Sequence, residues 1–237
     1  ADQQPVPLAV MVPLALLFQR RIFKLRREAK QLAIISTLKR HVPRELVADL
    51  RRGEMRITTG VCICTDARNF TELSTRVSST QLAQLLDDYY DSLIPVFLDA
   101  GGHVIDSAGD GLLAVFPGVS SGHETALLSI NAATALLAAA DDFDRRHNGY
   151  ELSIRIGIAA GEFTLGVIGS TSRYFYKAIG QPINTAARLE ALNKELGSRC
   201  LIESGILPTD TPRERLRDRD RHTLKGLKEP VTVVELI

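Results

Sequence analysis

Two aspartates in this sequence stand where carboxylates could bind a divalent cation. Asp110 lies in a Gly-Asp-Gly turn within the apolar segment 103–116, which predicts a β-hairpin with this carboxylate at its tip. Asp66 follows the apolar segment 60–65, which predicts a strand, and precedes residues expected to open a helix. If the two strands are neighbours in one sheet, both carboxylates emerge at the same edge. Two carboxylates with an open side suit hard cations such as Mg²⁺ held against a triphosphate.

A second pair with chemical potential, Asn184 and Arg188, lies one helical turn apart in the predicted helix 182–196. Such a pair is also common on a solvated helix face. An aspartate in a Gly-Asp-Gly turn is likewise common for the geometry of the turn alone. The residue types by themselves therefore leave a structural role and a chemical role open.

The elements that must position these residues indicate an α+β fold. Apolar periodicity predicts helices over residues 79–100, 124–143 and 182–196. It predicts further strands over residues 201–202 and 231–237, and a strand pair around Gly161-Glu162 formed by residues 152–161 and 163–168. Ser78 and Gln81 are expected to form the capping box of the first helix. Strands that are adjacent in places and separated by helices elsewhere indicate a mixed or antiparallel sheet, covered mainly on one side.

Composition is that of an ordinary globular protein. The chain has 237 residues, of which 45% are hydrophobic and 24% are charged, and its formal net charge is +1. Its three cysteines show neither a metal-binding spacing nor a plausible disulfide framework, which fits a reducing compartment. Overall charge therefore predicts no special partner, although the N-terminal quarter is rich in lysine and arginine.

The N-terminal apolar run, residues 6–18, is too short to cross a bilayer alone, for which about 20 residues are needed. The basic residues after it are typical of a cytoplasmic exit, whereas a signal peptide carries its charges before the apolar run. A buried helix is the third alternative. We expect residues 1–18 to be the end of a transmembrane helix in the inner or plasma membrane, with the rest of the chain in the cytoplasm.

Residues 19–53 are predicted to be a basic helical linker. Apolar residues recur at heptad spacing from Phe18 to Leu32, which favours a short two-helix coiled coil. An amphipathic helix lying on the domain or on anionic lipid is the alternative. A short helix is expected over residues 41–50, with Pro43 near its start and Gly53 ending it.

Five short motifs follow one another in the remaining sequence. They are Asp66-Ala67-Arg68-Asn69-Phe70-Thr71; Gly109-Asp110; Arg155-Ile156-Gly157-Ile158 with Gly161-Glu162 and Gly166-Val167-Ile168-Gly169; Ile179 to Glu190; and Leu224-Lys225-Gly226. In this order and at these separations they resemble the class III nucleotidyl cyclase catalytic domain of bacterial membrane receptors. The resemblance implies that residues 54–237 form a ferredoxin-like, palm-type βαββαβ core with additional strands and helices, preceded by an N-terminal helix.

The resemblance also implies a catalytic site shared by two subunits of a homodimer. Asp66, Asp110 and the carbonyl of Ala67 match the ligands of two Mg²⁺ or Mn²⁺ ions per site. Asn184 and Arg188, from the other subunit, match the residues that handle the ribose and the transition state. The remaining matches, which are to the phosphate-binding positions, are Asn69, Phe70, Thr71, Arg155 and Lys225. Arg155 could instead be an ion-pair partner within the sheet, and Lys225 an ordinary surface lysine.

The base-selecting positions depart from the family pattern. Adenylate cyclases typically carry lysine and then aspartate or threonine there, whereas this chain has Asp106 and Lys177. A carboxylate and an ammonium can satisfy either adenine or guanine. Formation of cyclic AMP from ATP is favoured because most bacterial members are adenylate cyclases, with guanylate cyclase and a nucleotide-binding pseudocyclase as alternatives. Asn69 and Gln181-Pro182 are further departures, and no nucleic-acid partner is expected.

Overall fold

The computed structural model describes residues 19–22, 24–25, 55–119, 122–147, 150, 152–170, 174–227 and 229–237. The chain divides into two units. The larger comprises Arg56–Leu165 and Lys177–Ile237, and the smaller comprises Ala1–Met55 and Gly166–Tyr176. In the smaller unit, residues 19–22 and 24–25 are helical. The predicted transmembrane end, residues 1–18, and most of the predicted linker, residues 19–53, lie outside the described residues.

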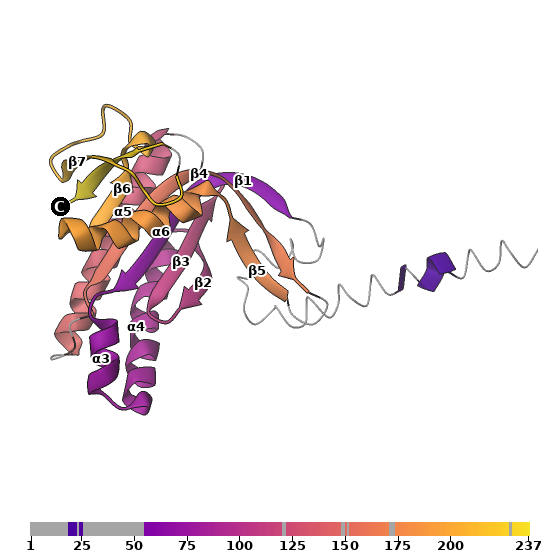
Figure 1. Ribbon diagram of the computed structural model, residues 1–237, viewed down its shortest axis with the longest axis horizontal. Helices are drawn as coiled ribbons and strands as arrows, with labels where there is room; N and C mark the ends of the chain where they lie inside the picture. The colour runs from indigo at the N-terminus through magenta and orange to yellow at the C-terminus, as the bar shows by residue number, and fades with distance from the viewer. Residues whose placement is uncertain are drawn as a thin grey trace, which may run out of the picture. The chain divides into compact units, whose positions relative to one another are not determined.

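The chain forms an eight-stranded mixed sheet (Figure 1), all of which belongs to the larger unit except the end of β4 and the start of β5. Its strand order is β2-β3-β1-β4-β6-β8-β7, and β5 pairs with β4. The strands are β1 (Arg56–Ala67), β2 (His103–Ala108), β3 (Gly111–Pro117), β4 (Ile154–Gly169), β5 (Tyr174–Ile179), β6 (Cys200–Glu203), β7 (Leu216–His222) and β8 (Val231–Leu236). Because β1 pairs antiparallel with both β3 and β4, the strand that leads to Asp66 lies inside the sheet.

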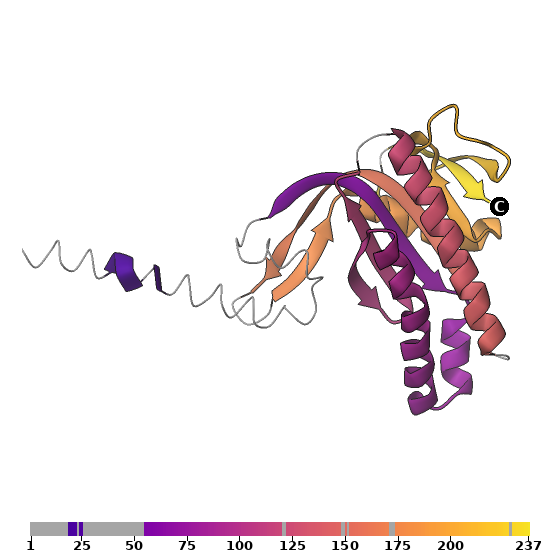
Figure 2. The same cartoon turned by 180° about the vertical axis from the view of Figure 1, so that it is seen from behind.

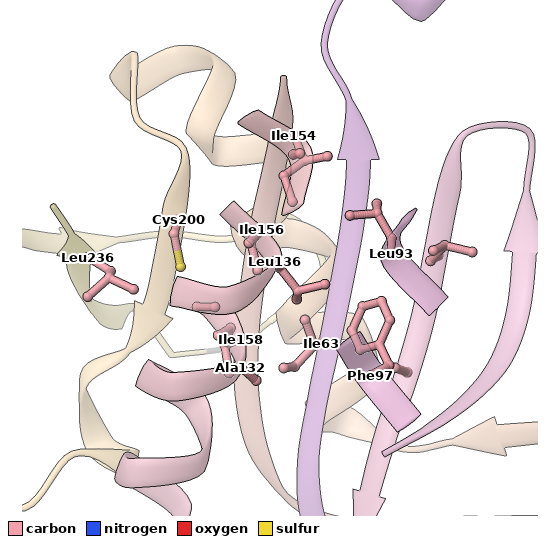
Figure 3. Close-up of a cluster of buried hydrophobic side chains, with 14 of the residues drawn as sticks. Ile63, Leu93, Phe97, Ala132, Leu136, Ile154, Ile156, Ile158, Cys200 and Leu236 are labelled. Atoms are coloured by element: carbon pink, nitrogen blue, oxygen red, sulfur yellow. The ribbon is translucent and has the colours of Figure 1, made fainter. Parts of the chain in front are cut away.

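Two long helices, α4 (Ser79–Asp99) and α5 (Gly122–Arg146), cover one face of the sheet (Figure 2). The predicted capping box is present, since the Ser78 hydroxyl accepts from the Gln81 backbone and the Gln81 side chain accepts from the Ser78 backbone. The helices bury apolar side chains against the strands (Figure 3). Leu93 and Phe97 of α4 and Leu136 of α5 are fully buried there. Of the described helices, α5 has the length and composition to cross a membrane, but its buried residues belong to this core.

A third helix, α6 (Gln181–Leu196), covers the opposite face (Figure 1). Its approach is close at Gly157, where a Cβ atom would lie 2.0 Å from the Ala186 carbonyl oxygen. The Asn193 side chain adds a hydrogen bond of 2.9 Å to the Ile156 carbonyl. The sheet is therefore covered on both faces, and the prediction of cover mainly on one side was incomplete.

The predicted strand pair around Gly161-Glu162 was wrong, because β4 is one continuous strand. Its ladder to β1 runs without a break from Ile154 to Leu165. Gly161 has φ 155° and lies against Pro182, so it is accommodated within the strand instead of reversing the chain. The three cysteines are free and buried, in agreement with the absence of a disulfide framework.

Candidate active site

Asp66 and Asp110 lie close together at one end of the central strands. The hairpin of β2 and β3 neighbours β1, which is the condition under which both carboxylates emerge at one edge, and its two-residue turn places Asp110 beside the end of that strand. Gly109 in this turn has φ 62°, a conformation that glycine adopts without strain. The Ala67 backbone N–H donates to Asp110 Oδ2 at 2.8 Å. A Cβ atom on Gly111 would lie 3.8 Å from Asp66 Oδ1, which puts the second carboxylate beside the same turn.

The surroundings of Asp110, including Asp66, affect its charge. Burial, and then the negative charge of Asp66, raise the pKa of Asp110 to about 6. Carboxylates that repel one another in this way provide a donor set suited to a divalent cation. Within the part of the chain that the structure describes, there is no cluster of three or more His, Cys, Asp or Glu residues with metal-binding geometry. Backbone carbonyls, water and substrate oxygens are further ligands that would suit such a cation.

Tyr90 of α4 holds the turn that carries Asp110. Its hydroxyl donates a hydrogen bond to the Gly109 carbonyl. Sequence reasoning missed this residue because the apolar periodicity of the helix selects its neighbour Tyr89, which is fully buried. The sequence feature that could have identified Tyr90 was its hydroxyl, next to that of Tyr89 in the same helix.

Arg155 connects Asp66 to α6. It is the register partner of Asp66 on β4, and its Nη2 donates to Asp66 Oδ2 at 2.5 Å. Its Nε donates to Glu190 Oε1 at 3.1 Å. The contact with Asp66 is the ion pair within the sheet that was the predicted alternative for Arg155. The contact with Glu190 adds a second carboxylate, which sequence reasoning missed. The signal for Glu190 was its place at the end of the motif that contains Arg188.

Burial shapes the charge of this ion-pair cluster. It is the largest factor that raises the pKa of Glu190 to about 7; Asp66 raises it further, whereas Arg155 opposes the shift. For Arg155, burial lowers the pKa, but the hydrogen bond to Asp66 and the charge of Glu190 outweigh it and raise the pKa. The guanidinium is thus held in its charged form between two carboxylates.

Asn69 occupies a position that requires left-handed backbone. It is the N-cap of the short helix α3 (Phe70–Arg76) and has φ 64°. Asparagine is among the few residues other than glycine that adopt this region readily. Asn69 therefore adopts this conformation with less strain than most other side chains would cause. Phe70 and Thr71 form the first turn of α3.

Asn184 and Arg188 are exposed on α6, while Thr185 and Leu189 are buried. Among the described residues, the structure gives no hydrogen bond or ion pair that joins either exposed residue to Asp66 or Asp110 within one chain. Asn184 lines a cavity of about 700 Å³ together with Gly226, the residue after the exposed Lys225. Among the described residues, the two predicted halves of the site are therefore not joined by a hydrogen bond or an ion pair in a single subunit.

The sequence and the fold agree with one family of known proteins. Residues 55–234 match the family model of the adenylate and guanylate cyclase catalytic domain. The chain belongs to this family. The match covers most of the chain and all the predicted site residues, so the cyclase fold prediction is confirmed.

Similar proteins include both kinds of cyclase. An adenylate cyclase of Anabaena cylindrica is 28% identical over 182 residues, which are 72% of this chain and 35% of that protein. The adenylyl cyclase CyaB from P. aeruginosa is 25% identical with a TM-score of 0.67, covering 78% of this chain and 96% of that one. The guanylyl cyclase Cya2 is 25% identical with a TM-score of 0.64, covering 78% and 93%. The chain spans about a third, or less, of the first curated relatives that it matches.

The two residues that the sequence analysis predicted to select the base form an ion pair. Lys177 of β5 donates to a carboxylate oxygen of Asp106 on β2, and both side chains remain partly exposed. Asp106 follows a register irregularity between β2 and β3, after Val104. The carboxylate and the ammonium that sequence analysis assigned to base selection are therefore ion-paired neighbours in one subunit.

Proposed function

We propose that this cyclase domain converts ATP to 3′,5′-cyclic AMP and pyrophosphate at a site shared by two copies of the chain. The observation that carries the proposal is the juxtaposition of Asp66 and Asp110 at one strand end, with Asp110 oriented by the Ala67 N–H. This arrangement exists in one subunit and requires no assumption about the partner. It supplies an acidic, partly open site, as a metal-dependent phosphoryl-transfer reaction needs.

Divalent cations fit this donor set. Asp66, Asp110 and the carbonyl of Ala67 would hold two Mg²⁺ or Mn²⁺ ions per site. When bound, such ions favour ionisation of the ribose hydroxyl and neutralise charge on the polyphosphate. The chain's own contribution is to orient the carboxylates through the Ala67 N–H and to hold the Asp110 turn through Tyr90.

Asn184 and Arg188 would come from the partner subunit. Both are exposed on α6, and no described hydrogen bond or ion pair joins them to the aspartates of the same chain, which leaves them available to a second copy. The Arg188 guanidinium offers a planar set of donors that stays charged, which suits negative charge developing on phosphoryl oxygens. The Asn184 amide would orient the ribose.

The remaining predicted residues would bind the phosphates. Backbone amides from Asn69 to Thr71 would donate to phosphate oxygens at the start of α3. Arg155 lies beside Asp66 and would reach the β- and γ-phosphates, and Lys225 is exposed in the loop between β7 and β8. These roles rest on the positions of the residues in the cyclase motifs.

Adenine is the proposed base because the similar proteins include bacterial adenylate cyclases that are 28% and 25% identical to this chain. A guanylate cyclase is the second candidate. Two observations favour it: the similarity to Cya2, and an Asp106–Lys177 pair whose carboxylate can accept from the N1 and N2 donors of guanine. A pseudocyclase, in which this ion pair closes the purine pocket, would bind nucleotide without turnover.

Attachment to a membrane through residues 6–18, with the catalytic domain in the cytoplasm, is part of the proposal. It rests on the apolar run and the basic residues that follow it. Fractionation of cells that express the chain with and without residues 1–18 tests it. Recovery of both forms in the soluble fraction would contradict attachment through residues 6–18 by themselves.

Mixing two inactive variants tests the shared site. Asp110→Ala and Arg188→Ala should each abolish cyclic AMP formation with ATP and Mn²⁺. If the chains exchange and assemble at random, the mixture should regain about a quarter of wild-type activity, because half the dimers then hold one intact site. A mixture of Asp110→Ala with Asp66→Ala is the matched control and should stay inactive. Failure of the first mixture to recover, with subunit exchange shown by fluorescence transfer, would contradict a shared site.

A further inference from the structure

The ion-pair cluster of Asp66, Arg155 and Glu190 supports an inference about how the site behaves before substrate binds. This inference rests on the proposed role of Asp66 as a metal ligand. Arg155 Nη2 donates to Asp66 Oδ2 at 2.5 Å. The Arg155 side chain is 17% exposed, whereas that of Asp66 is 35% exposed. A guanidinium that is largely screened from solvent thus occupies one oxygen of a carboxylate that solvent can still reach.

Glu190 holds the same guanidinium from the other side. Its Oε1 accepts from Arg155 Nε at 3.1 Å, and its side chain is only 15% exposed. The position of Glu190 is fixed because α6 lies directly on Gly157 and is tied to Ile156 by Asn193. The two contacts use different nitrogens of Arg155, so the bond to Asp66 can break while the bond to Glu190 remains.

A divalent cation and this guanidinium would compete for the same carboxylate. Both are positively charged, and the cluster with Asp110 contains three carboxylates and the Arg155 cation. Without a metal ion, the guanidinium reduces repulsion among these carboxylates. With a metal ion on Asp66, a bound guanidinium would repel the metal, so its Nη groups would be displaced.

We propose that Arg155 is the resident counterion of Asp66 in the absence of metal and nucleotide, and that Glu190 is a positioning residue that retains Arg155 in the site when a cation displaces it. The Nη donors of Arg155 would then remain beside the proposed metal ligands, where they could donate to the phosphates of a nucleoside triphosphate. Glu190 acts only through Arg155 and need not touch the substrate.

Calorimetric titration of the nucleotide-free chain with Mn²⁺ alone tests whether a cation displaces Arg155 from Asp66. Arg155→Gln removes the competing cation, so we expect Mn²⁺ to bind about fivefold more tightly than to wild type. Glu190→Gln leaves Arg155 with Asp66 as its one charged partner in the cluster, so we expect Mn²⁺ to bind about threefold more weakly. Arg199→Gln, which breaks the separate 2.7 Å ion pair with Asp141, is the matched control and should leave Mn²⁺ binding unchanged.

A second measurement, the melting temperature, distinguishes a change in Mn²⁺ affinity from loss of the fold. In metal-free buffer, Arg155→Gln should lower the melting temperature, and saturating Mn²⁺ should raise it by more than it does for wild type. Equal or weaker Mn²⁺ binding by a folded Arg155→Gln protein, or tighter binding by Glu190→Gln, would contradict the proposed competition between Arg155 and the cation for Asp66. Equal Mn²⁺ binding by wild type and Asp66→Asn would instead overturn the proposed metal site, and the inference with it.

Discussion

The backbone N–H of Ala67 donates to the Asp110 carboxylate at 2.8 Å, so the residue after one proposed metal ligand orients the other. The two aspartates are 44 positions apart in sequence but belong to neighbouring strands, and this bond fixes their relation through the backbone. Substitution of Ala67 by any residue other than proline leaves this donor in place. The geometry of the carboxylate pair therefore depends on the turn at Gly109 and on whatever holds that turn.

Tyr90 is the side chain that holds the Gly109 carbonyl. Replacing it with phenylalanine keeps the ring and removes one hydrogen bond, which should cost about 1 kcal/mol of stability. Looser placement of Asp110 should weaken Mn²⁺ binding by up to about fivefold. Urea unfolding and Mn²⁺ titration measure the two effects.

Tyr89→Phe is the matched control for Tyr90→Phe. The Tyr89 hydroxyl is buried and has no hydrogen-bond partner in the described structure, so its removal should leave Mn²⁺ affinity unchanged and should not destabilise the fold. Equal effects of the two substitutions on Mn²⁺ affinity would show that Tyr90 does not position the Asp110 turn.

Gly157 is a position where α6 lies directly against the sheet. A methyl group there would meet the Ala186 carbonyl at 2.0 Å and the Glu190 backbone nitrogen at 2.2 Å. Gly157→Ala should therefore destabilise the protein by roughly 3 kcal/mol or more, because backbone must move. Gly205→Ala is the control, since nothing lies within 4 Å of its Cβ position. Similar urea midpoints for both variants would contradict this packing.

The Asp106–Lys177 pair predicts a change in base preference. Exchanging the two residues, Asp106→Lys with Lys177→Asp, keeps opposite charges in contact and should alter stability by less than about 1 kcal/mol. The exchange restores the arrangement typical of adenylate cyclases, so the ratio of kcat/KM for ATP to that for GTP should rise. Asp106→Lys alone places two cations together and should lose both stability and activity. A ratio that the double exchange leaves unchanged would mean that the pair does not contact the base.

The raised pKa values of Asp110, about 6, and Glu190, about 7, predict a pH dependence of the metal-free protein. Between their unfolded values near 4 and these folded values, the folded state binds more protons than the unfolded state. The free energy of unfolding should therefore fall as pH rises from about 4.5 to about 7. Unfolding in urea with EDTA, across this range, measures the slope.

Combining Asp110→Asn with Glu190→Gln should reduce that slope. Asp142→Asn is the control, because hydrogen bonds from Arg146 and Arg145 lower the pKa of Asp142 and place its contribution at more acidic pH. Stability that rises with pH in the wild type from about 5 to about 7 would contradict the raised values.

Local sequence patterns predicted the elements that carry the proposed site. The features that were not predicted depend on contacts between residues far apart in the sequence. The hairpin around Asp110, the helix with Asn184 and Arg188, and the Ser78–Gln81 capping box follow from turn chemistry and periodicity. β7 was not predicted because its sequence is almost wholly charged, and it is held by pairing with β8 and by ion pairs of Arg217 and Arg219 with Glu235.

Dependence on long-range contacts also explains why two residues around the site were not predicted. Tyr90 and Glu190 act through partners 19 and 35 positions away, and no local pattern specifies such contacts. The reversal expected at Gly161-Glu162 failed because pairing with β1 keeps both residues extended. Glycine in a strand and glycine in a turn look alike until the neighbouring strand is known.

Product analysis of the wild-type chain and of Asp110→Ala, each incubated with Mn²⁺ and either ATP or GTP, tests the central claim most directly. We predict cyclic AMP and pyrophosphate from ATP with wild type, little product from GTP, and a loss of at least about 100-fold with a folded Asp110→Ala protein. Cyclic GMP from GTP with none from ATP would contradict the assignment of the base. Absence of any cyclic nucleotide, or a product yield that Asp110→Ala leaves intact, would contradict the proposed catalytic site.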